Sequence, residues 1–498
     1  MYNAYVTRIK NLHKHPNADR LQLGECFGNT VCVNLEYTDN QLGIYFPCDG
    51  QLSVEFAEAN NLLRKKDDAG NSIGGYMDPN KRNVTAIRLR GEKSDGLFLP
   101  LTCLETFGDV SGLKEGDVIN TFNGHEICCK YIPRRTHRQG HVSDGNRTRK
   151  KKKVDVAPLF AEHADTEQLA YNLGAFKPGD EIEITLKMHG TSQRTGYLPV
   201  VKGWKVKNKF FQGIVNKYAP SSNLSAFVRK CVDIAMRDAT PIYDWGYVSG
   251  TRRTVLDNYD GGYYGSNEFR EKHSKTFEGK LWKGETVYYE VVGFTHTSAP
   301  IMAEGNNEKL GKDFVNQYGK TTVFSYGCEP FGFKVIPPDP KIPTATPKVD
   351  FTKPQSDIYV YRMTMTNEDG AVVEYTPDFM RYRCEQMGAK TVPVFAKVYV
   401  KEDAVLAHHS DGTVSGGSLP KDTCIGEAVK MIAEEYYDGP DPIGKTHIRE
   451  GVVVRILNRP KFCAYKHKNH SFKMLSGIIV ESIADNNIEI SEDILAEL

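Results

Sequence analysis

Short apolar runs separated by turn residues dominate the first quarter of the chain. Such runs cover residues 30–35, 43–46, 84–89 and 96–101, with glycine, aspartate and asparagine between them. Apolar runs with this punctuation are typical of β-strands. Because many short strands in succession favour a small closed barrel, we expect residues 1–133 to form a β-barrel domain.

The pattern changes abruptly after residue 133. Residues 134–153 contain nine Lys or Arg residues against one acidic residue and show no hydrophobic period. A segment of this kind cannot bury an apolar face, so residues 134–155 are predicted to be a basic linker. Its charge suits either contact with phosphates or a solubilising tether.

Helix-like and strand-like patterns are mixed from residue 156 onward. Apolar residues at helical spacing, or residues typical of helix ends, predict helices at 165–173, 222–238 and 426–438. Apolar runs at 181–186, 287–293 and 451–456 are typical of strands. The mixture predicts an α+β domain over residues 156–498.

The composition limits the class of protein. The 498 residues are 40% hydrophobic and 26% charged, which is typical of a soluble globular protein. The net charge is only +1, so any surface for nucleic acid has to be local. No apolar run is long enough to span a membrane, and the N-terminus does not resemble a signal peptide. We therefore expect a cytoplasmic protein whose 11 scattered cysteines stay reduced.

Lys187 is the first candidate for covalent chemistry. It follows the apolar run 181–186 and precedes His189, Gly190 and Thr191. A lysine amine is a nucleophile only after it has lost its proton, and burial or neighbouring cations favour that loss. The alternative interpretation is a surface lysine at the end of a strand.

Further charged residues lie within strand-like segments downstream. Glu290 interrupts the apolar run 287–293, and Glu450 precedes three consecutive valines. A carboxylate among apolar residues is costly without a partner, so both are either site residues or members of structural ion pairs. Lys466 and Lys468 alternate along a strand, which lets both side chains reach one phosphate.

The order of these residues resembles that of the motifs of the covalent nucleotidyltransferases, which include ATP-dependent DNA and RNA ligases and mRNA capping enzymes. His189 followed by Thr191 is similar to the RNA ligase 2-like branch. The segment 15–21 is similar to a short motif of OB-type tRNA-binding domains. With such a domain at its N-terminal end, the domain order resembles that of the Deinococcus-type RNA ligases. The sequence departs from the Deinococcus-type pattern in two ways. It has histidine at position 189, where that type usually has aspartate, and it has long insertions around residues 300–355.

The resemblance implies a nucleotidyltransferase (ATP-grasp-like ligase) domain of antiparallel sheets flanked by helices, after an OB-like barrel that binds RNA. Lys187 would form a lysine–AMP intermediate with ATP, and Glu450 would position Mg²⁺ or Mn²⁺. Glu290 would accept a hydrogen bond from the ribose. The remaining residues implied to contact the nucleotide or its phosphates are Leu186, His189, Gly190, Thr191, Lys466 and Lys468.

Two further segments leave alternatives open. In Ser249–Leu256, which resembles the ribose- and phosphate-binding arginine motif of the family, Arg253 is our first choice and Arg252 the alternative. Tyr359 and Tyr361 lie where relatives stack an aromatic ring on adenine, and strict alternation would place both on one face. We choose Tyr361, and a core tyrosine is the other interpretation.

The function implied is that of an ATP-dependent RNA ligase for RNA repair. It would join 5′-phosphate and 3′-hydroxyl ends through Lys187–AMP and an RNA with an adenylylated 5′ end. The expected partners are ATP and RNA, in a nicked duplex or an RNA–DNA hybrid, and the chain would act as a monomer. The alternatives are a capping-type guanylyltransferase and a non-catalytic RNA-binding protein.

Residues 439–446 match the phosphate-binding pattern G-x-x-x-x-G-K-[ST] letter by letter. That loop works because a strand leads in and the N-terminus of a helix leads out. Here a helix is predicted before the match and a strand after it, and Pro440 and Pro442 each lack a backbone donor. We do not interpret this segment as a phosphate-binding loop.

Overall fold

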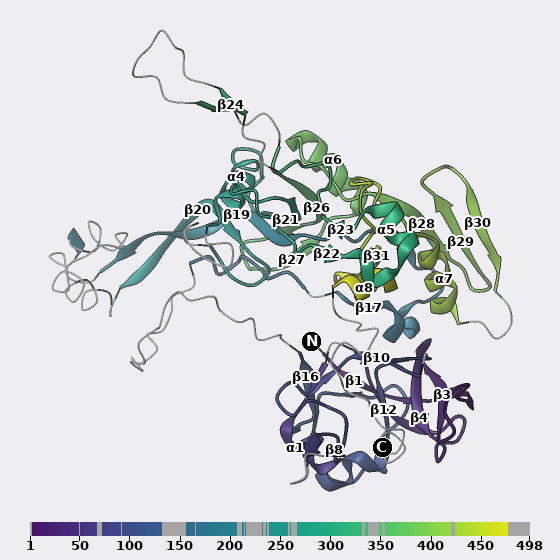
Figure 1. Cartoon of the computed structure of the whole chain (residues 1–498). Helices are drawn as coiled ribbons and strands as arrows, with labels where there is room; N and C mark the ends of the chain where they lie inside the picture. Colours follow the sequence, from purple (N-terminus) through teal and green to yellow (C-terminus); the bar gives the residue numbers. More distant parts are fainter. Residues whose placement is uncertain are drawn as a thin grey trace. The chain divides into compact units, whose positions relative to one another are not determined.

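The computed structural model describes residues 2–48, 50–66, 72–90, 92–131, 156–164, 166–206, 212–213, 215, 232, 236, 239–256, 259, 266–330, 334–336, 348–350, 354–419 and 424–476. They belong to two compact units. The first combines residues 1–145 with residues 305–320 and 468–498, and the second comprises residues 146–304 and 321–467. Figure 1 labels their helices and strands in the colours of the sequence.

Short antiparallel strands build the N-terminal part of the first unit. They are β1 (Ala4–Arg8), β2 (Lys10–Lys14), β3 (Leu21–Cys26), β4 (Asn29–Asn34), β5 (Leu42–Phe46), β6 (Gly50–Leu52), β7 (Arg64–Lys66), β8 (Ser72–Gly74), β9 (Asn83–Val84), β10 (Ala86–Leu89), β11 (Glu92–Asp95), β12 (Leu97–Pro100), β13 (Val118–Ile119), β14 (Thr121–Phe122), β15 (His125–Glu126) and β16 (Cys128–Lys130). The helical elements of the unit are α1 (Val54–Ala59), α5 (Lys312–Tyr318), α8 (His470–Leu475) and the 3₁₀ segments Leu101–Phe107 and Asn307–Leu310.

The core of this unit lies between its largest sheet and α1. That sheet has the order β12-β5-β1-β13. Alternate residues such as Val6, Ile44 and Leu99 point into one cluster with Phe56 and Leu104. All four predicted strand regions are confirmed, although the run 84–89 is divided between β9 and β10. The sheets of the described residues are short and separate, without a closed barrel, so the OB-like assignment stays a prediction.

Two large sheets build the second unit. The strands are β17 (Glu167–Gln168), β18 (Glu181–Leu186), β19 (Thr191–Lys205), β20 (Thr240–Gly250), β21 (Glu285–Gly293), β26 (Ser356–Thr366), β27 (Val372–Glu374), β28 (Val394–Val400), β29 (Ala404–His409), β30 (Val414–Ser418), β31 (Gly451–Ile456) and β32 (Cys463–Lys468), with the short strands β23 (Thr321–Thr322), β24 (Lys334–Ile336) and β25 (Lys348–Asp350) lying outside these two sheets. The short strand β22 (Gly305–Asn306) belongs to the first unit. One sheet has the order β17-β32-β31-β18-β28-β29-β30, and the other has the order β20-β19-β21-β26-β27. The described part of this unit is mostly strand in antiparallel sheets, with a few helices, which is as much of the expected α+β architecture as the structure shows.

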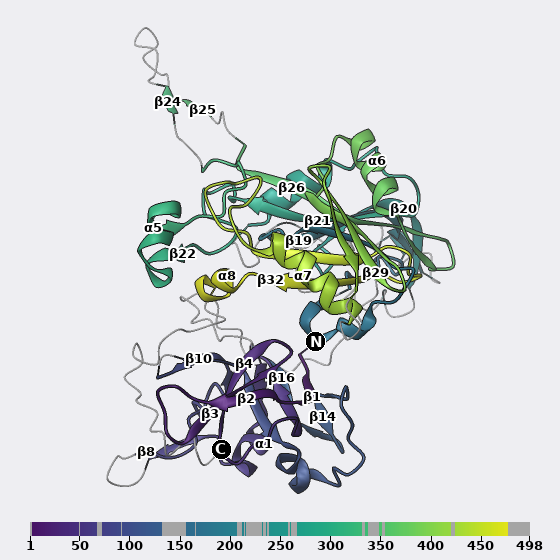
Figure 2. The ribbon, with the colours of Figure 1, turned by 90° about the vertical axis from the view of Figure 1, so that its right-hand side faces the viewer.

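Helices cover one face of the five-stranded sheet. Phe269 of α4 (Glu268–Lys275) and Met380 and Cys384 of α6 (Pro377–Met387) pack against Val287 and Val360 of the sheet. Figure 2 shows α6 beside β26 and β21. β19 and β20 form a long hairpin that projects from the unit (Figure 1). None of the helices in the described ranges is both long and apolar enough to cross a membrane.

The helix predictions have different outcomes. α7 (Ile425–Tyr437) confirms the helix at 426–438 within one residue. The helix at 165–173 is wrong, because Glu167 and Gln168 pair in parallel with Tyr465 and Lys466 and only 3₁₀ turns follow. The predicted helix at 222–238 lies almost wholly outside the described residues. The basic run 134–153 lies entirely outside them.

Candidate active site

Lys187 lies where β18 leaves the seven-stranded sheet. β18 and β31 are antiparallel, with Leu186 opposite Val452. The backbone amide of Lys187 continues this pairing by donating to the carbonyl oxygen of Gly451 at 3.0 Å. In an antiparallel pair, the end of one strand meets the start of the other. Lys187 is therefore brought beside Glu450, the residue that precedes β31.

The Glu450 carboxylate binds two side chains of the Lys187 segment. Its Oε1 lies 2.8 Å from Nζ of Lys187, and its Oε2 lies 3.2 Å from Nδ1 of His189. A carboxylate only accepts, so Nδ1 of His189 carries the donated proton. The Glu450 side chain is only 4% exposed, and these two partners offset the cost of burying its charge. The neighbouring Arg449 instead donates to backbone carbonyls.

Gly190 brings the chain across to the five-stranded sheet. A Cβ at this position would lie 2.4 Å from the carbonyl oxygen of Val291 and 2.9 Å from Cγ of Glu290. No side chain fits so close an approach, which explains the glycine. β19 then pairs with β21, with Thr191 opposite Val291 and Ser192 opposite Glu290. The four residues after β18 thus connect the two sheets and place Lys187 near Glu290.

Glu290 lies on the face of β21 opposite the helices. Tyr289 and Val291 pack in the cluster beneath α4 and α6, and alternation turns Glu290 the other way. Burial raises the pKa of Glu290 to about 7. The negative charge of Glu450 acts in the same direction, while Lys187 and nearby arginines oppose the shift. Glu290 therefore titrates near neutral pH.

A cavity of about 100 Å³ is lined by side chains from both sheets. Its lining includes the predicted site residues Leu186, Lys187, Arg252, Glu290 and Tyr361. Other lining residues from the two sheets and their connections are His163, Thr185, Met188, Val453, Arg455 and Phe462. An apolar and aromatic lining with a few charged groups is usual for small-molecule sites.

Tyr361 and His163 form an aromatic wall of the cavity. Their ring centroids are 5.1 Å apart, and the hydroxyl of Tyr361 lies 2.9 Å from Oγ of Ser192. Tyr359 is buried and does not line the cavity. The prediction that both tyrosines share one face is confirmed, because Tyr359 pairs with Glu290 and Tyr361 hydrogen-bonds to Ser192, which also pairs with Glu290. The register shift of β26 lies between Val360 and Arg362 and leaves the two tyrosines on the same face.

The structure distinguishes the two candidate arginines. Arg252 lines the cavity, whereas Arg253, our first choice, is not among the lining residues. Sequence reasoning also missed Arg270 of α4, which is 4% exposed. Its guanidinium donates to the carbonyl oxygen of Ser192 at 3.1 Å and to Oγ1 of Thr191 at 2.5 Å. Arg270 thereby fixes the start of β19 next to the Lys187 segment.

Lys466 and Lys468 lie on β32, the strand next to β31. Both are half-buried, and Nζ of Lys468 lies 5.6 Å from the ring centroid of Phe472. Neither lysine is among the residues that line the cavity. Their roles as phosphate-binding residues therefore stay predictions.

The P-loop-like segment is a turn folded around its own carboxylate. Oδ1 of the buried Asp441 accepts hydrogen bonds from the amides of Ile443 and Gly444, each at 2.8 Å. A phosphate cradle would need such amides free, and α7 precedes this turn while β31 follows it. The geometry does not support phosphate binding here.

The carboxylates at the site could hold a metal ion only if water or substrate phosphates supplied its remaining ligands. The described part of the chain has no group of three or more His, Cys, Asp or Glu side chains that could hold a metal. Mg²⁺ is usually bound by one or two carboxylates together with water and substrate phosphates. Glu450, whose carboxylate lies between Lys187 and His189, could supply one such oxygen in exchange for one of these contacts.

No protein-family model and no curated protein matches this sequence. Among solved structures, the chain is similar to the RNA ligase of Naegleria gruberi. The structure with PPi is 14% identical with a TM-score of 0.48, covering 94% of this chain and 97% of that chain. A mutant with AMP and Mn is 13% identical with a TM-score of 0.49 over the same shares. At these values the likeness does not establish a family, and the function has to be argued from the site.

Proposed function

We propose that this chain is an ATP-dependent RNA ligase that joins 5′-phosphate to 3′-hydroxyl ends. The observation that carries the proposal is the arrangement of Lys187, paired with Glu450 at 2.8 Å, at a cavity shared with Glu290, Arg252 and Tyr361. A nucleophilic amine, an anionic metal ligand and cationic and aromatic groups are the parts that nucleotidyl transfer needs.

In the first step, Nζ of Lys187 attacks the α-phosphorus of ATP. A P–N bond forms, the bond between the α-phosphorus and the bridging oxygen breaks, and pyrophosphate leaves. The ammonium must lose a proton first, and Oε1 of Glu450 lies within hydrogen-bond distance of it. A Mg²⁺ or Mn²⁺ ion held by Glu450 and the phosphates would neutralise charge on the leaving pyrophosphate.

The other side chains bind and orient the nucleotide. The ionised Glu290 accepts a hydrogen bond from a ribose hydroxyl, and Arg252 meets phosphate charge. Tyr361, held by Ser192, offers its ring to the base. Lys466 and Lys468 neutralise charge on the transferred phosphate. These roles position the reacting atoms, which is most of what phosphoryl transfer requires.

Two transfers to RNA complete the reaction. A 5′-phosphate oxygen of RNA attacks the AMP phosphorus, so the P–N bond breaks and Lys187 is regenerated. The 3′-hydroxyl of the second end then attacks the RNA phosphorus, a phosphodiester forms, and AMP leaves. We assign RNA binding to the predicted OB-like domain at 1–133 and the basic linker at 134–155.

Labelling with nucleotide tests the proposal. The full chain is incubated with a divalent metal and either ATP or GTP labelled at the α-phosphate, with Lys187→Ala as the control. Label from ATP on the wild type alone supports the ligase, and label from GTP selects a capping-type guanylyltransferase. A wild type that takes up neither would refute covalent catalysis and leave an RNA-binding protein. Sealing assays on nicked duplexes, single strands and RNA–DNA hybrids then identify the substrate.

A further inference from the structure

Exposed aromatic side chains gather on the second unit away from the cavity lining. Among the described residues, all the exposed large aromatics belong to this unit, and they are Tyr243, Trp282, Phe379, Tyr382 and Tyr399. They lie on β20, on the turn before β21, on α6 and on β28. Trp282 and Tyr382 are about half exposed, at 49% and 52%. Large aromatic side chains kept in water mark an interaction surface.

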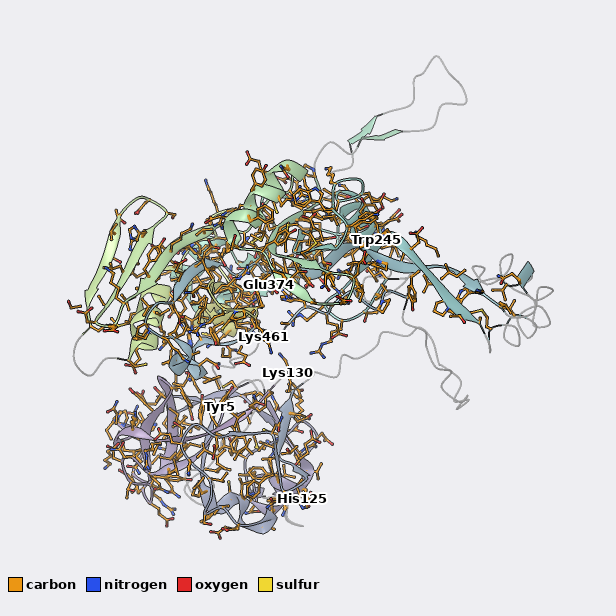
Figure 3. All side chains as sticks on the ribbon, turned by 180° about the vertical axis from the view of Figure 1, so that it is seen from behind. Tyr5, His125, Lys130, Trp245, Glu374 and Lys461 are labelled. Atoms are coloured by element: carbon orange, nitrogen blue, oxygen red, sulfur yellow. The ribbon has the colours of Figure 1, made fainter. Side chains whose placement is uncertain are left out.

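The hairpin of β19 and β20 supplies the first part of this surface. Its register places Tyr197 opposite Tyr247 and Pro199 opposite Trp245, and alternation puts them on one face. The rings of Tyr197 and Tyr247 are stacked with centroids 4.7 Å apart, and Trp245 lies 5.9 Å from Tyr197. Figure 3 labels Trp245 near the base of the hairpin. Alternate positions on a strand are about 6.8 Å apart, which allows one extended nucleotide per ring.

The opposite face of the hairpin is already occupied. Leu198, Val200 and Val248 point that way and pack with Ala157 and Phe160 in an apolar cluster. That cluster stabilises the hairpin. On the other face, Tyr197 and Tyr247 are half-buried against the core cluster beneath α4 and α6, and Trp245 lies at the edge of this pair.

Contacts of Trp282 and Lys283, on the turn before β21, link β20 to α6. Nζ of Lys283 lies 5.2 Å from the ring centroid of Trp245, and the next ring in the chain is that of Trp282. Phe379 lies 6.4 Å from Trp282 and stacks on Tyr382 at 6.1 Å with an angle of 24° between the rings. Trp282, Phe379 and Tyr382 thus form a row of neighbouring rings, and Trp245 lies beside Lys283, the residue after Trp282. We call these four residues, Trp245, Trp282, Phe379 and Tyr382, the aromatic track.

Positive charge accompanies the aromatic track. Lys283 is exposed beside Trp245. The guanidinium of Arg383 lies 3.8 Å from the ring centroid of Trp282, but it is buried and paired with Glu285, so it holds the ring in place and offers no charge to the surface. Arg381 pairs with both the buried Glu183 and the exposed Asp378, and Lys397 pairs with Asp378. A groove lined by Asp378, Arg381, Lys397 and Tyr399 extends the surface beyond α6. Cations alongside a row of rings are complementary to the phosphates and bases of a single strand.

We propose that the aromatic track binds single-stranded RNA by stacking its bases, with the exposed Lys283 contacting a phosphate. The inference rests on the proposed function, because it takes RNA as the substrate, and it adds a second RNA-binding surface to that function. Stacking needs only the face of a base, so this binding should depend little on sequence. Duplex RNA, whose bases are already stacked, should bind there poorly.

Alanine substitutions test the stacking. Trp282→Ala and Tyr382→Ala in the full chain are compared with the wild type by fluorescence anisotropy with a short labelled single-stranded RNA. Each should raise Kd about fivefold or more, because one base loses its ring. Trp282→Phe and Tyr382→Phe should restore most of the affinity. The matched control is Met431→Ala, which removes another exposed apolar side chain (66%) on α7 and should leave Kd unchanged.

Two results would overturn the aromatic track. One is unchanged affinity of both alanine variants for single-stranded RNA, and the other is an equal loss in the phenylalanine variants. Lys283→Gln should also flatten the plot of log K against log salt by about 0.7 if one phosphate contact is lost. AMP adduct formation is measured on the same samples and should equal that of the wild type. A wild type without the adduct refutes the ligase proposal whatever the RNA affinities are.

Discussion

Nδ1 of His189 lies 3.2 Å from Oε2 of Glu450, so the histidine and Lys187 hold the same carboxylate from two sides. We predict that His189→Ala slows formation of the AMP adduct roughly tenfold or more, because a buried carboxylate oxygen loses its donor. His189→Asn should retain most activity, since its side-chain amide can occupy the place of Nδ1. Single-turnover adduct formation measures both, and equal rates for the two variants would contradict the role given to this hydrogen bond.

Lys187→Ala and Lys187→Arg should both fail to form an AMP adduct. The guanidinium of arginine is not deprotonated in proteins, so it cannot attack phosphorus. The two variants should differ in stability, because arginine can still pair with the buried Glu450 and alanine cannot. Intact-protein mass spectrometry and thermal melting report the two properties separately. An adduct that persists in either variant would show that another residue is the nucleophile.

Glu290 should make both stability and nucleotide binding depend on pH. Its pKa is raised to about 7 in the folded protein, so the folded state binds a proton more tightly than the unfolded chain. The stabilisation is complete below the unfolded pKa and is lost as the pH rises through about 7. Nucleotide affinity should change the opposite way, because the ionised carboxylate accepts the ribose hydrogen bond.

Glu290→Gln provides the comparison for this pH dependence. The wild type should lose up to about 3 kcal/mol between pH 5 and pH 8 from this group, and the variant should not. Urea unfolding and ATP binding at the two pH values measure the difference. Parallel pH profiles for the two proteins would show that Glu290 does not titrate in this range.

Gly190→Ala should reduce adduct formation strongly without unfolding the protein. The added Cβ would lie 2.4 Å from the carbonyl oxygen of Val291, so the connection between the sheets has to move and displace Lys187. Gly174→Ala is the matched control, because nothing lies within 4 Å of its Cβ position. If both variants react at the wild-type rate, the close approach at Gly190 does not position the nucleophile.

Three lysines that lie in sequence motifs should affect adduct formation differently when they are replaced by alanine. Lys466→Ala and Lys468→Ala should each slow adduct formation about a hundredfold through loss of charge stabilisation. Lys445→Ala should react like the wild type, because its turn is closed around Asp441. Initial rates with saturating ATP measure all three. An inactive Lys445→Ala protein would instead support a phosphate-binding loop.

The hydrophobic pattern along the chain predicted helices and strands correctly where residues close in sequence determine the local structure. β18 has the bounds read from its apolar run, and α7 differs by one residue from its prediction. The helix expected at 165–173 failed because Glu167 and Gln168 pair with β32, almost 300 residues later in the chain. No local signal reports such a pairing.

The site shows the same limit. Lys187 follows a strand-like run, Glu290 lies within one and Glu450 precedes one, so all three could be chosen from sequence, and the structure places them together. The choice between Arg252 and Arg253 depended on how the turn after β20 is oriented. The choice of Tyr361 over Tyr359 depended on which of two rings on the same face lines the cavity. His163 and Arg270 belong to no recognisable motif, because only the tertiary fold brings them to the site.

Residues Lys187 to Gly190 connect the seven-stranded sheet to the five-stranded sheet. The amine of Lys187 is therefore attached at the edge of the first sheet and lies next to the second. Glu450 belongs to the seven-stranded sheet, whereas Glu290 and Tyr361 belong to the five-stranded sheet. A nucleotide in the cavity would have to touch both. The distance between nucleophile and phosphorus would therefore vary with any sliding of one sheet over the other. Substitutions in the packing between the sheets, far from the phosphate, should then change the rate of the chemical step more than the affinity for ATP.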